Sequence, residues 1–251
     1  MKFHARVVGR INIPKDSRIV LDHVRLCGED YCGRKLMQFC TIGCHLEGCR
    51  FDKARIDCAQ LGAGREMSEF IDCIFDGAHM NMGGGFSRFV RCSFRDVDLR
   101  GWRSRVELID CTFSGRLRQA IFSGTVLEKD QALLGRERNE FHGNDFSAMD
   151  LIEVEFRKGI DLTQQRLPSG PQYLYLPDAA ASLARTRSEL VNWEGSPDAR
   201  RVALRIVDNW LEEEVIKGGQ RQLFLRPENY YGYSALPREA IDKVFSLLRP
   251  S

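Results

Sequence analysis

Cysteine and histidine are the residue types in this 251-residue sequence whose chemistry includes metal binding and nucleophilic catalysis. Six of the nine cysteines lie in the first quarter of the chain, close to His45. They are Cys27, Cys32, Cys40, Cys44, Cys49 and Cys58. No pair of cysteines has the C-x2-C spacing that is typical of structural zinc sites. We therefore expect no metal site.

The five histidines are scattered, and none stands beside a serine or cysteine nucleophile in a recognised catalytic motif. They are His4, His23, His45, His79 and His142. The glycine-rich stretches at 62–64 and 83–85 lack the Lys-Ser or Lys-Thr pair that follows a phosphate loop. The sequence therefore predicts no catalytic residue and no small-molecule cofactor.

A cluster of cationic and aromatic residues follows in "LRGWRSRVELIDCTFSGRLR" (99–118). Guanidinium and indole groups together favour anionic or aromatic partners. The candidate partner-binding surface consists of Arg100, Trp102, Arg103, Arg105, Arg116 and Arg118. The alternative is a solvated charged face that Glu107 and Asp110 partly neutralise.

A repeat of nineteen residues positions these side chains. "FIDCIF" (70–75) returns as "FVRCSF" (89–94) and as "LIDCTF" (108–113). Extended in both directions, the series runs through Leu127 and Asp130 and predicts six turns without an insertion. The predicted interior ladder consists of Phe51, Phe70, Cys73, Phe75, Phe89, Cys92, Phe94, Leu108, Cys111, Phe113, Phe146 and Leu151. Since free cysteine packs as a small hydrophobe, the cysteines in this series are predicted to be packing residues with reduced thiols.

A shorter period of five residues lies inside each turn. Large apolar residues recur every five positions from Leu46 to Leu61, each preceded two places earlier by cysteine or alanine. An α-helix needs a period near 3.6 and a strand a period of 2, so the pattern fits a coil that turns a corner every five residues. Four sides of five, five, five and four residues make one turn of nineteen.

The triplets Cys73-Ile74-Phe75, Cys92-Ser93-Phe94 and Cys111-Thr112-Phe113 carry a family resemblance. The region 39–162 resembles the pentapeptide-repeat family, whose pattern is a small residue, a polar residue, then Leu or Phe. The resemblance implies a mainly β fold, a right-handed quadrilateral parallel β-helix with about 19 residues per coil. Stacking such coils at ~4.8 Å pairs their backbone groups, and the open ends then need caps.

The sequence divides into four segments on these patterns. Residues 1–38 are predicted to be strands that cap or begin the coils, and residues 39–165 form the β-helix. The proline-rich stretch 166–177 is predicted to be a linker. Residues 178–251 form a helical module with N-caps at Asp178 and Ser196 and a strand in "RQLFLR". This module either caps the rod or forms a homodimer.

Charge and hydropathy restrict the function. The net charge is +2, and the coil region 41–165 has 17 basic and 20 acidic residues. The N-terminal "MKFHARVVGR" lacks the apolar core of a signal peptide and no run suits a bilayer span, so we expect a cytoplasmic protein without a membrane partner. We predict a non-enzymatic scaffold that binds a protein partner.

Three other functions remain open from the sequence. Some members of the resembled family imitate duplex DNA, bind gyrase or another type II topoisomerase, and protect it from inhibitors or toxins; that mimicry needs a more negative rod. Polysaccharide lyases and left-handed acyltransferases also contain β-helices, but with other periods. Nucleic-acid binding by the C-terminal helices is disfavoured by their near-neutral charge.

Overall fold

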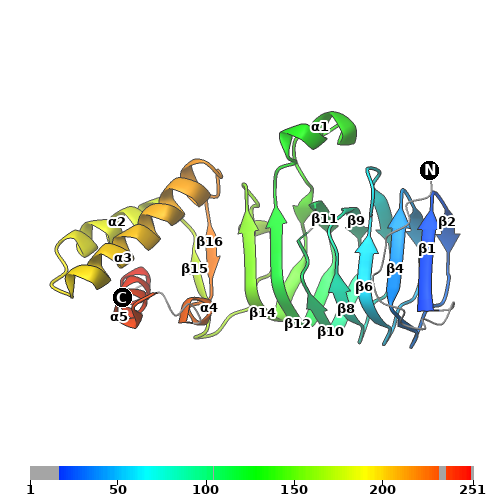
Figure 1. Cartoon of the computed structure of the whole chain (residues 1–251), viewed down its shortest axis with the longest axis horizontal. Coiled ribbons are helices and arrows are strands. Elements are labelled where there is room, and N and C mark those ends of the chain that lie inside the picture. The colour runs from blue at the N-terminus through cyan, green and yellow to red at the C-terminus, as the bar shows by residue number, and fades with distance from the viewer. Residues whose placement is uncertain (1–16, 104, 232–235, 250–251) are drawn as a thin grey trace, which may run out of the picture.

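The computed structural model describes residues 17–103, 105–231 and 236–249. The chain forms a parallel β-solenoid of about five turns, followed by a C-terminal module that contains most of the helices (Figure 1). The predicted fold class, a parallel β-helix with a helical C-terminal segment, is confirmed at this level.

Two parallel sheets make up the solenoid. The longer sheet has the order β1-β4-β6-β8-β10-β12-β14, with β3 paired to β6. Its strands are β1 (Arg18–Asp22), β3 (Lys35–Leu36), β4 (Gln38–Ile42), β6 (Arg55–Leu61), β8 (His79–Met82), β10 (Ser93–Arg100), β12 (Thr112–Ser123) and β14 (Asp145–Arg157). The second sheet runs from β2 to β13. Its strands are β2 (Arg25–Cys27), β5 (His45–Glu47), β7 (Ser68–Ile71), β9 (Phe86–Val90), β11 (Arg105–Ile109) and β13 (Phe141–His142).

The turns differ in length more than the sequence predicts. Phe70 pairs with Phe89, and Phe89 with Leu108, so these two turns have nineteen residues. Leu46, however, pairs with Phe70, which makes a turn of 24 residues, and Leu108 pairs with Phe141, which makes one of 33. The predicted run of six turns without an insertion is therefore wrong.

Two insertions explain the difference. Five residues are added between β6 and β7. The nineteen-residue series aligns Phe51 with Phe70, but in the structure the Phe51 ring stacks on Phe75. The segment that includes Leu127 leaves the coil and forms the short helix α1 (Glu128–Leu134). Leu127 is half exposed instead of lying in the interior ladder.

Aromatic rings fill the interior in a continuous stack. Neighbouring rings along one side of the coil have centroids 4.5 to 4.9 Å apart. The stack consists of Tyr31, Phe51, Phe75, Phe94, Phe113 and Phe146. All twelve residues of the predicted ladder are at most 2% exposed. This spacing matches the distance between paired strands, so ring stacking and backbone pairing reinforce one another.

Corners of the coil use left-handed backbone conformations. Asp72, Arg91 and Asp110 lie one above another at nineteen-residue intervals with φ of 52°, 52° and 55°. Each N–H is donated to a carbonyl of the following coil, as from Arg91 to Ile109 (2.9 Å). The left-handed region is costly for residues other than glycine, so the stacked hydrogen bonds must offset that cost at every turn.

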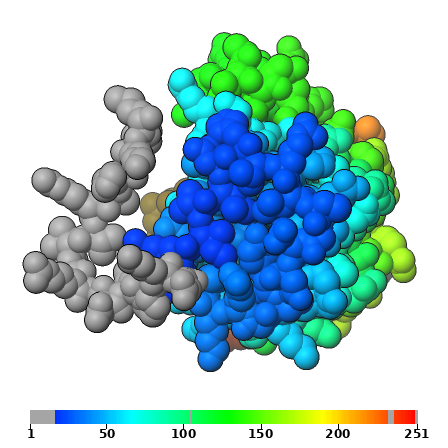
Figure 2. Space-filling view, turned by 90° about the vertical axis from the view of Figure 1, so that its right-hand side faces the viewer, coloured from blue at the N-terminus to red at the C-terminus, as the bar shows by residue number. Residues whose placement is uncertain are grey.

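The solenoid begins earlier than residue 39. Strands β1 and β2 already pair with β4 and β5, so residues 18–27 belong to the first coil. Figure 2 looks onto this end, with the first coil in blue and the α1 insertion in green above it. The predicted N-terminal strand "HARVVGRINI", like His4, lies outside the described residues.

In its described residues, the C-terminal module combines a two-stranded sheet with four α-helices and a π-helical segment. It consists of β15 (Leu174–Leu176), α2 (Ala179–Val191), α3 (Pro197–Asn209), the π-helical η3 (Trp210–Ile216), β16 (Leu223–Leu225), α4 (Glu228–Tyr231) and α5 (Arg238–Leu248). Asp178 and Ser196 accept hydrogen bonds from the N–H groups of Ala181 and Ala199 and so cap α2 and α3, as predicted. A short 3-10 helix, η2 (Leu162–Gln164), ends the last coil.

The stretch 166–177 is an ordered part of the fold. Arg166 forms a parallel bridge with Asp145, and β15 pairs antiparallel with β16. The Phe224 ring then packs on Tyr173 (centroids 5.0 Å apart) and on Phe156 (6.4 Å) at the end of the rod. The module thus caps the C-terminal end of the solenoid.

Candidate partner-binding site

Three residues of the predicted arginine surface lie together on the outer face of the longer sheet. Arg100 pairs in register with Arg118. Arg118 forms an ion pair with Asp98 (2.7 Å), and Arg116 lies 3.7 Å from Asp150. These aspartates and arginines alternate across the strands, so this face has mixed charge.

The other residues of that prediction lie elsewhere. Arg105 is on the second sheet, where it pairs with Asp130 of α1 (2.8 Å) and lies over the Phe86 ring. Arg103 is exposed in the turn between the sheets. The six residues therefore do not form one surface.

Trp102 is wrongly predicted as a contact residue, because it is 1% exposed and belongs to the core. Its indole contacts Phe89 and Phe122 edge to face, with centroids 5.6 and 5.7 Å away. The side of the coil that begins at Gly101 is irregular, and a large ring fills the interior where the five-residue pattern is lost.

Buried Glu107 fixes the α1 insertion against the second sheet. Its carboxylate is 1% exposed and lies 2.6 Å from Arg88 and 3.0 Å from Arg136, which follows α1. It also accepts a hydrogen bond from the N–H of Glu140 (3.0 Å). Two guanidinium groups and one backbone donor compensate the buried charge, so Glu107 has a structural role.

Six of the cysteines are buried, Cys32 and Cys58 are partly exposed, and Cys27 is exposed at the end of β2; all nine are free thiols. In the regular coils the thiols donate to backbone carbonyls, as from Cys92 Sγ to the Phe70 oxygen (3.3 Å). Burial raises the pKa of the Cys92 thiol well above its usual value. Among the residues that the structure describes, no group of three or more His, Cys, Asp or Glu is placed to hold a metal ion.

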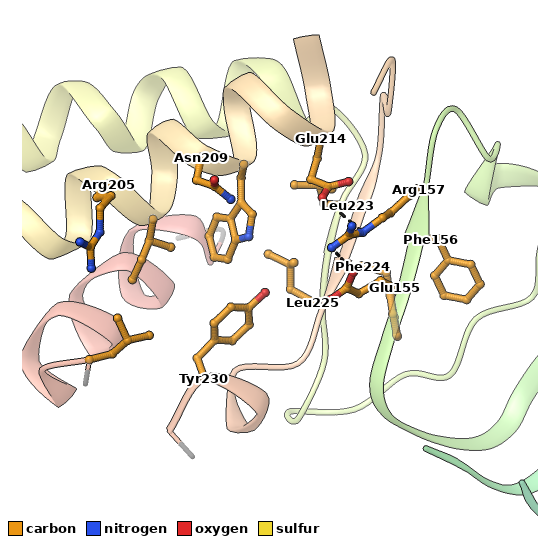
Figure 3. A pocket seen from close by; sticks show the side chains of 13 residues that line it. Glu155, Phe156, Arg157, Arg205, Asn209, Glu214, Leu223, Phe224, Leu225 and Tyr230 are labelled. Carbon is orange, nitrogen blue, oxygen red and sulfur yellow. Dashed lines mark ion pairs between the residues drawn. The ribbon is translucent and has the colours of Figure 1, made fainter. Parts of the chain in front are cut away.

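A concavity lies at the junction of β14 with the C-terminal module (Figure 3). It has a volume of about 520 Å³, within the roughly 300–1,000 Å³ that is usual for binding pockets. One wall comes from the end of β14, and the opposite wall from α3, η3, β16 and α4. The lining residues are Glu155, Phe156, Arg157, Arg205, Ile206, Asn209, Trp210, Glu214, Leu223, Phe224, Leu225, Tyr230 and Leu236.

Aromatic and aliphatic side chains form most of the inner surface of this junction cavity. Trp210 and Tyr230 meet edge to face with centroids 5.4 Å apart. Leu225 lies beside Tyr230 in Figure 3. Trp210 begins the π-helical segment, where the wider helix changes the direction of the side chains that follow.

Charged groups lie on both sides of the cavity. Arg157 pairs with Glu155 and with Glu214, whose carboxylate is 3.3 Å from Arg157 Nε (Figure 3). Burial raises the pKa of Glu214 even though Arg157 acts in the opposite direction. Arg205 is exposed and makes no hydrogen bond or ion pair with any residue in the described part of the chain.

No protein-family model matches this sequence, and no curated protein matches it either. In the described segments, no helix has both the length and the apolar content needed to cross a bilayer.

The sequence did not predict the junction cavity. Its lining residues come from 155–157 in the solenoid and from 205–236 in the C-terminal module. The two regions have different sequence periods, so no single pattern links them. Trp210 and Tyr230 are large aromatic residues, but the module sequence also contains Trp193, Phe224, Tyr231, Tyr233 and Phe245, so aromatic content alone does not single them out.

Proposed function

We propose that this protein is a non-enzymatic scaffold whose solenoid holds a protein-binding site at the junction cavity. The observation that carries the proposal is an open cavity with an aromatic and aliphatic lining, at whose rim Arg205 has no partner among the described residues. Buried aromatic side chains and arginines contribute most of the free energy in protein interfaces.

The solenoid supports this proposal by its rigidity. Each inner coil is hydrogen-bonded to a coil on either side, and the ring stack runs through six residues. The wall made by β14 is therefore held in place before a partner arrives. A preformed wall lowers the ordering cost of binding.

We further propose that the coils belong to the pentapeptide-repeat class. The triplets that begin at Cys73, Cys92 and Cys111 support the assignment, because the cysteine and the phenylalanine of each are at most 1% exposed. The intervening residue (Ile74, Ser93 or Thr112) is partly exposed in each case.

The test of the binding function is site-specific photocrosslinking in the native host. A photoreactive phenylalanine analogue replaces Asn209 at the rim of the cavity. As a control, the same analogue replaces the exposed Glu47 on β5 of the solenoid. We expect a discrete adduct from position 209 alone, and the purified partner should lose affinity for the Arg205→Glu variant. Equal adducts from both positions, or none, would reject the site.

Binding to gyrase or another topoisomerase remains a second prediction, and the mixed charge of the arginine-bearing face gives it less support. A supercoiling assay with purified gyrase tests it, with protection from an inhibitor as the expected result. A homodimer through the C-terminal helices and a cytoplasmic location also remain proposals; light scattering and fractionation test them.

A further inference from the structure

The N-terminal end of the solenoid leaves two strand edges without a partner. Strand β1 is the first strand of the longer sheet and β2 the first of the second sheet, and no strand of the described residues pairs with their outer edges. No other described segment lies over the first coil in Figure 2. An unpaired edge presents N–H and C=O groups that can bind another extended chain.

The interior of the first coil is also incompletely covered. Its apolar residues pack against the core but keep part of their surface exposed. They are Ile19, Leu21, Val24 and Leu26. Phe39, which pairs with Ile19 from the second coil, is fully buried. A further layer over this end would therefore bury apolar surface, as each coil does for the next.

The hydrogen bonds of the second coil show how β1 is oriented. The Thr41 carbonyl accepts from the N–H groups of Gly62 (3.2 Å) and Ala63 (2.7 Å), so the backbone groups of Thr41 face the third coil. Backbone groups alternate in direction along a strand, so those of Cys40 face β1. Cys40 lies in register with Val20.

The outer edge of β1 therefore presents the backbone groups of three residues. In parallel pairing, a residue that faces a neighbouring strand bonds to the residues on either side of its partner and not to the partner itself. The N–H and C=O groups of Val20 consequently point away from β4. Those of Arg18 and Asp22 point the same way, because the direction alternates along the strand.

The sequence of this strand, Arg-Ile-Val-Leu-Asp, is complementary to itself when it is read in the opposite direction. When a second β1 runs antiparallel with Val20 opposite Val20, Arg18 lies opposite Asp22 at both ends of the pair. Ile19 then lies opposite Leu21, over the interior of the coils. Opposite charges in directly opposed positions stabilise a strand pair, and a shift of two residues would remove both charge pairs.

Both charged groups are available for such a contact. Arg18 forms no ion pair with a described residue. Asp22 accepts a hydrogen bond from the adjacent His23 ring (2.5 Å), yet its side chain is 65% exposed. Val20, between them, is 59% exposed, although it is an apolar residue.

We propose that two copies of this chain join end to end through their first coils, with β1 antiparallel to β1 of the second copy about a two-fold axis at Val20. The C-terminal module caps the other end of each rod, so the assembly closes at two copies. This inference concerns a surface remote from the junction cavity. It places the two cavities at opposite ends of one longer rod, because the module lies at the far end from β1 (Figure 1).

Charge exchange in the full-length chain tests this interface. The contact is limited to one coil end, so we expect a Kd of about 1–100 µM for the natural dimer by sedimentation velocity. Arg18→Asp and Asp22→Arg each place like charges opposite one another, and each should weaken self-association at least tenfold. Arg185→Asp, an exposed change on α2, is the matched control and should leave the Kd unchanged.

Mixing the two β1 variants gives the sharper result. An equimolar mixture of Arg18→Asp and Asp22→Arg should dimerise as tightly as the natural protein, because the acidic positions of one variant face the basic positions of the other. Recovery in the mixture also shows that both variants are folded.

A disulfide tests the register. In the proposed pair the two Val20 Cα atoms lie about 5.5 Å apart, a separation that permits a disulfide. Val20→Cys should therefore give a covalent dimer under mild oxidation. Val191→Cys, at an exposed position of α2, should give no more than the natural protein, in which the exposed Cys27 sets the background.

The contrary outcomes are distinct. A chain that stays monomeric at about 200 µM has its first coil closed in another way, and the inference is wrong. A dimer that neither β1 variant weakens is formed elsewhere, as through the C-terminal helices, and also overturns the inference. So does a mixture that stays monomeric. Each of these results leaves the junction cavity to be judged by crosslinking from position 209.

Discussion

Strand edges are covered differently in the regular coils between Phe70 and Phe113 and at the junction beside β14. In the coils, each strand edge is covered by the next copy of the same pattern, and the side chains inside are almost fully buried. At the junction the repeat ends, and a different structure must cover the last edge. Side chains such as Gln220 cover part of it, and a cavity remains beside the rest.

This difference shows where a repeat protein can acquire a binding site. A coil that is covered on both sides by equivalent coils offers a flat surface, whereas an end cap with another period cannot match the last coil everywhere. The resulting mismatch leaves a cavity with apolar surface. Four measurements can break or sharpen this comparison.

The largest effect is expected for a ring deletion inside the regular coils. Phe94→Ala removes a fully buried ring that stacks on Phe75 (4.7 Å) and Phe113 (4.9 Å). We expect a loss of about 4 kcal/mol in the free energy of unfolding, since stacked neighbours cannot close the gap. Phe224→Ala at the junction should lose only about 2 kcal/mol, because a partly open site relaxes more easily. Equal losses in urea unfolding would remove the distinction between the two regions.

The second effect concerns the insertion held by Glu107. Glu107→Ala removes the buried carboxylate that Arg88, Arg136 and the N–H of Glu140 share. Arg88 keeps its ion pair with the Glu140 side chain (2.6 Å), and we expect a loss of about 3 kcal/mol. Hydrogen exchange should also become faster in residues 128–140. Glu137→Ala, an exposed change in the same insertion, should stay within about 0.5 kcal/mol. If Glu107→Ala matches this control, the insertion is not held by the buried carboxylate.

The sequence predicts the coil and the C-terminal helices because both are local patterns. The period of five identifies the sides of a coil, and capping residues such as Asp178 and Ser196 locate the helix starts correctly. The register is harder to predict, because five inserted residues equal one side of the coil. Phe51 and Phe70 therefore fit the same series although they lie on different sides.

The junction cavity and the burial of Trp102 depend on tertiary contacts. Nothing in the local spacing distinguishes an inward indole from an outward one once the pattern of five is lost. Likewise, the cavity brings Arg157 and Arg205 to one site from segments with different periods. Only the docking of the module onto β14 determines that arrangement.

A smaller effect is expected from Cys92→Ser in the regular coils. The sequence suggests a loss of about 1–3 kcal/mol from a poorly satisfied buried hydroxyl. Cys92 Sγ lies 3.3 Å from the Phe70 carbonyl, so a serine hydroxyl has an acceptor, and we expect about 1 kcal/mol. Cys58→Ser, at a partly exposed position, is the control. A loss above about 3 kcal/mol, or a change in metal content by mass spectrometry, would contradict a packing role.

The smallest effect tests electrostatics at the junction through the pH dependence of stability. Burial raises the pKa of Glu214, so the folded state holds this proton more tightly than the unfolded state does. Its ionisation therefore weakens the fold as the pH rises from the ordinary glutamate pKa of about 4.3 through the raised value. Glu214→Gln removes that cost, while Arg157 keeps its pair with Glu155. The melting temperatures of Glu214→Gln and of the natural protein are then compared. The difference, variant minus natural protein, should be larger at pH 7 than at pH 4. The margin should be small, because the Glu214 side chain is only partly buried.

Glu189→Gln, an exposed change on α2 that removes the same charge, should show no such trend. A reversed trend for Glu214→Gln would mean that the ion pair with Arg157 outweighs burial, and that the junction is held by charge rather than left mismatched.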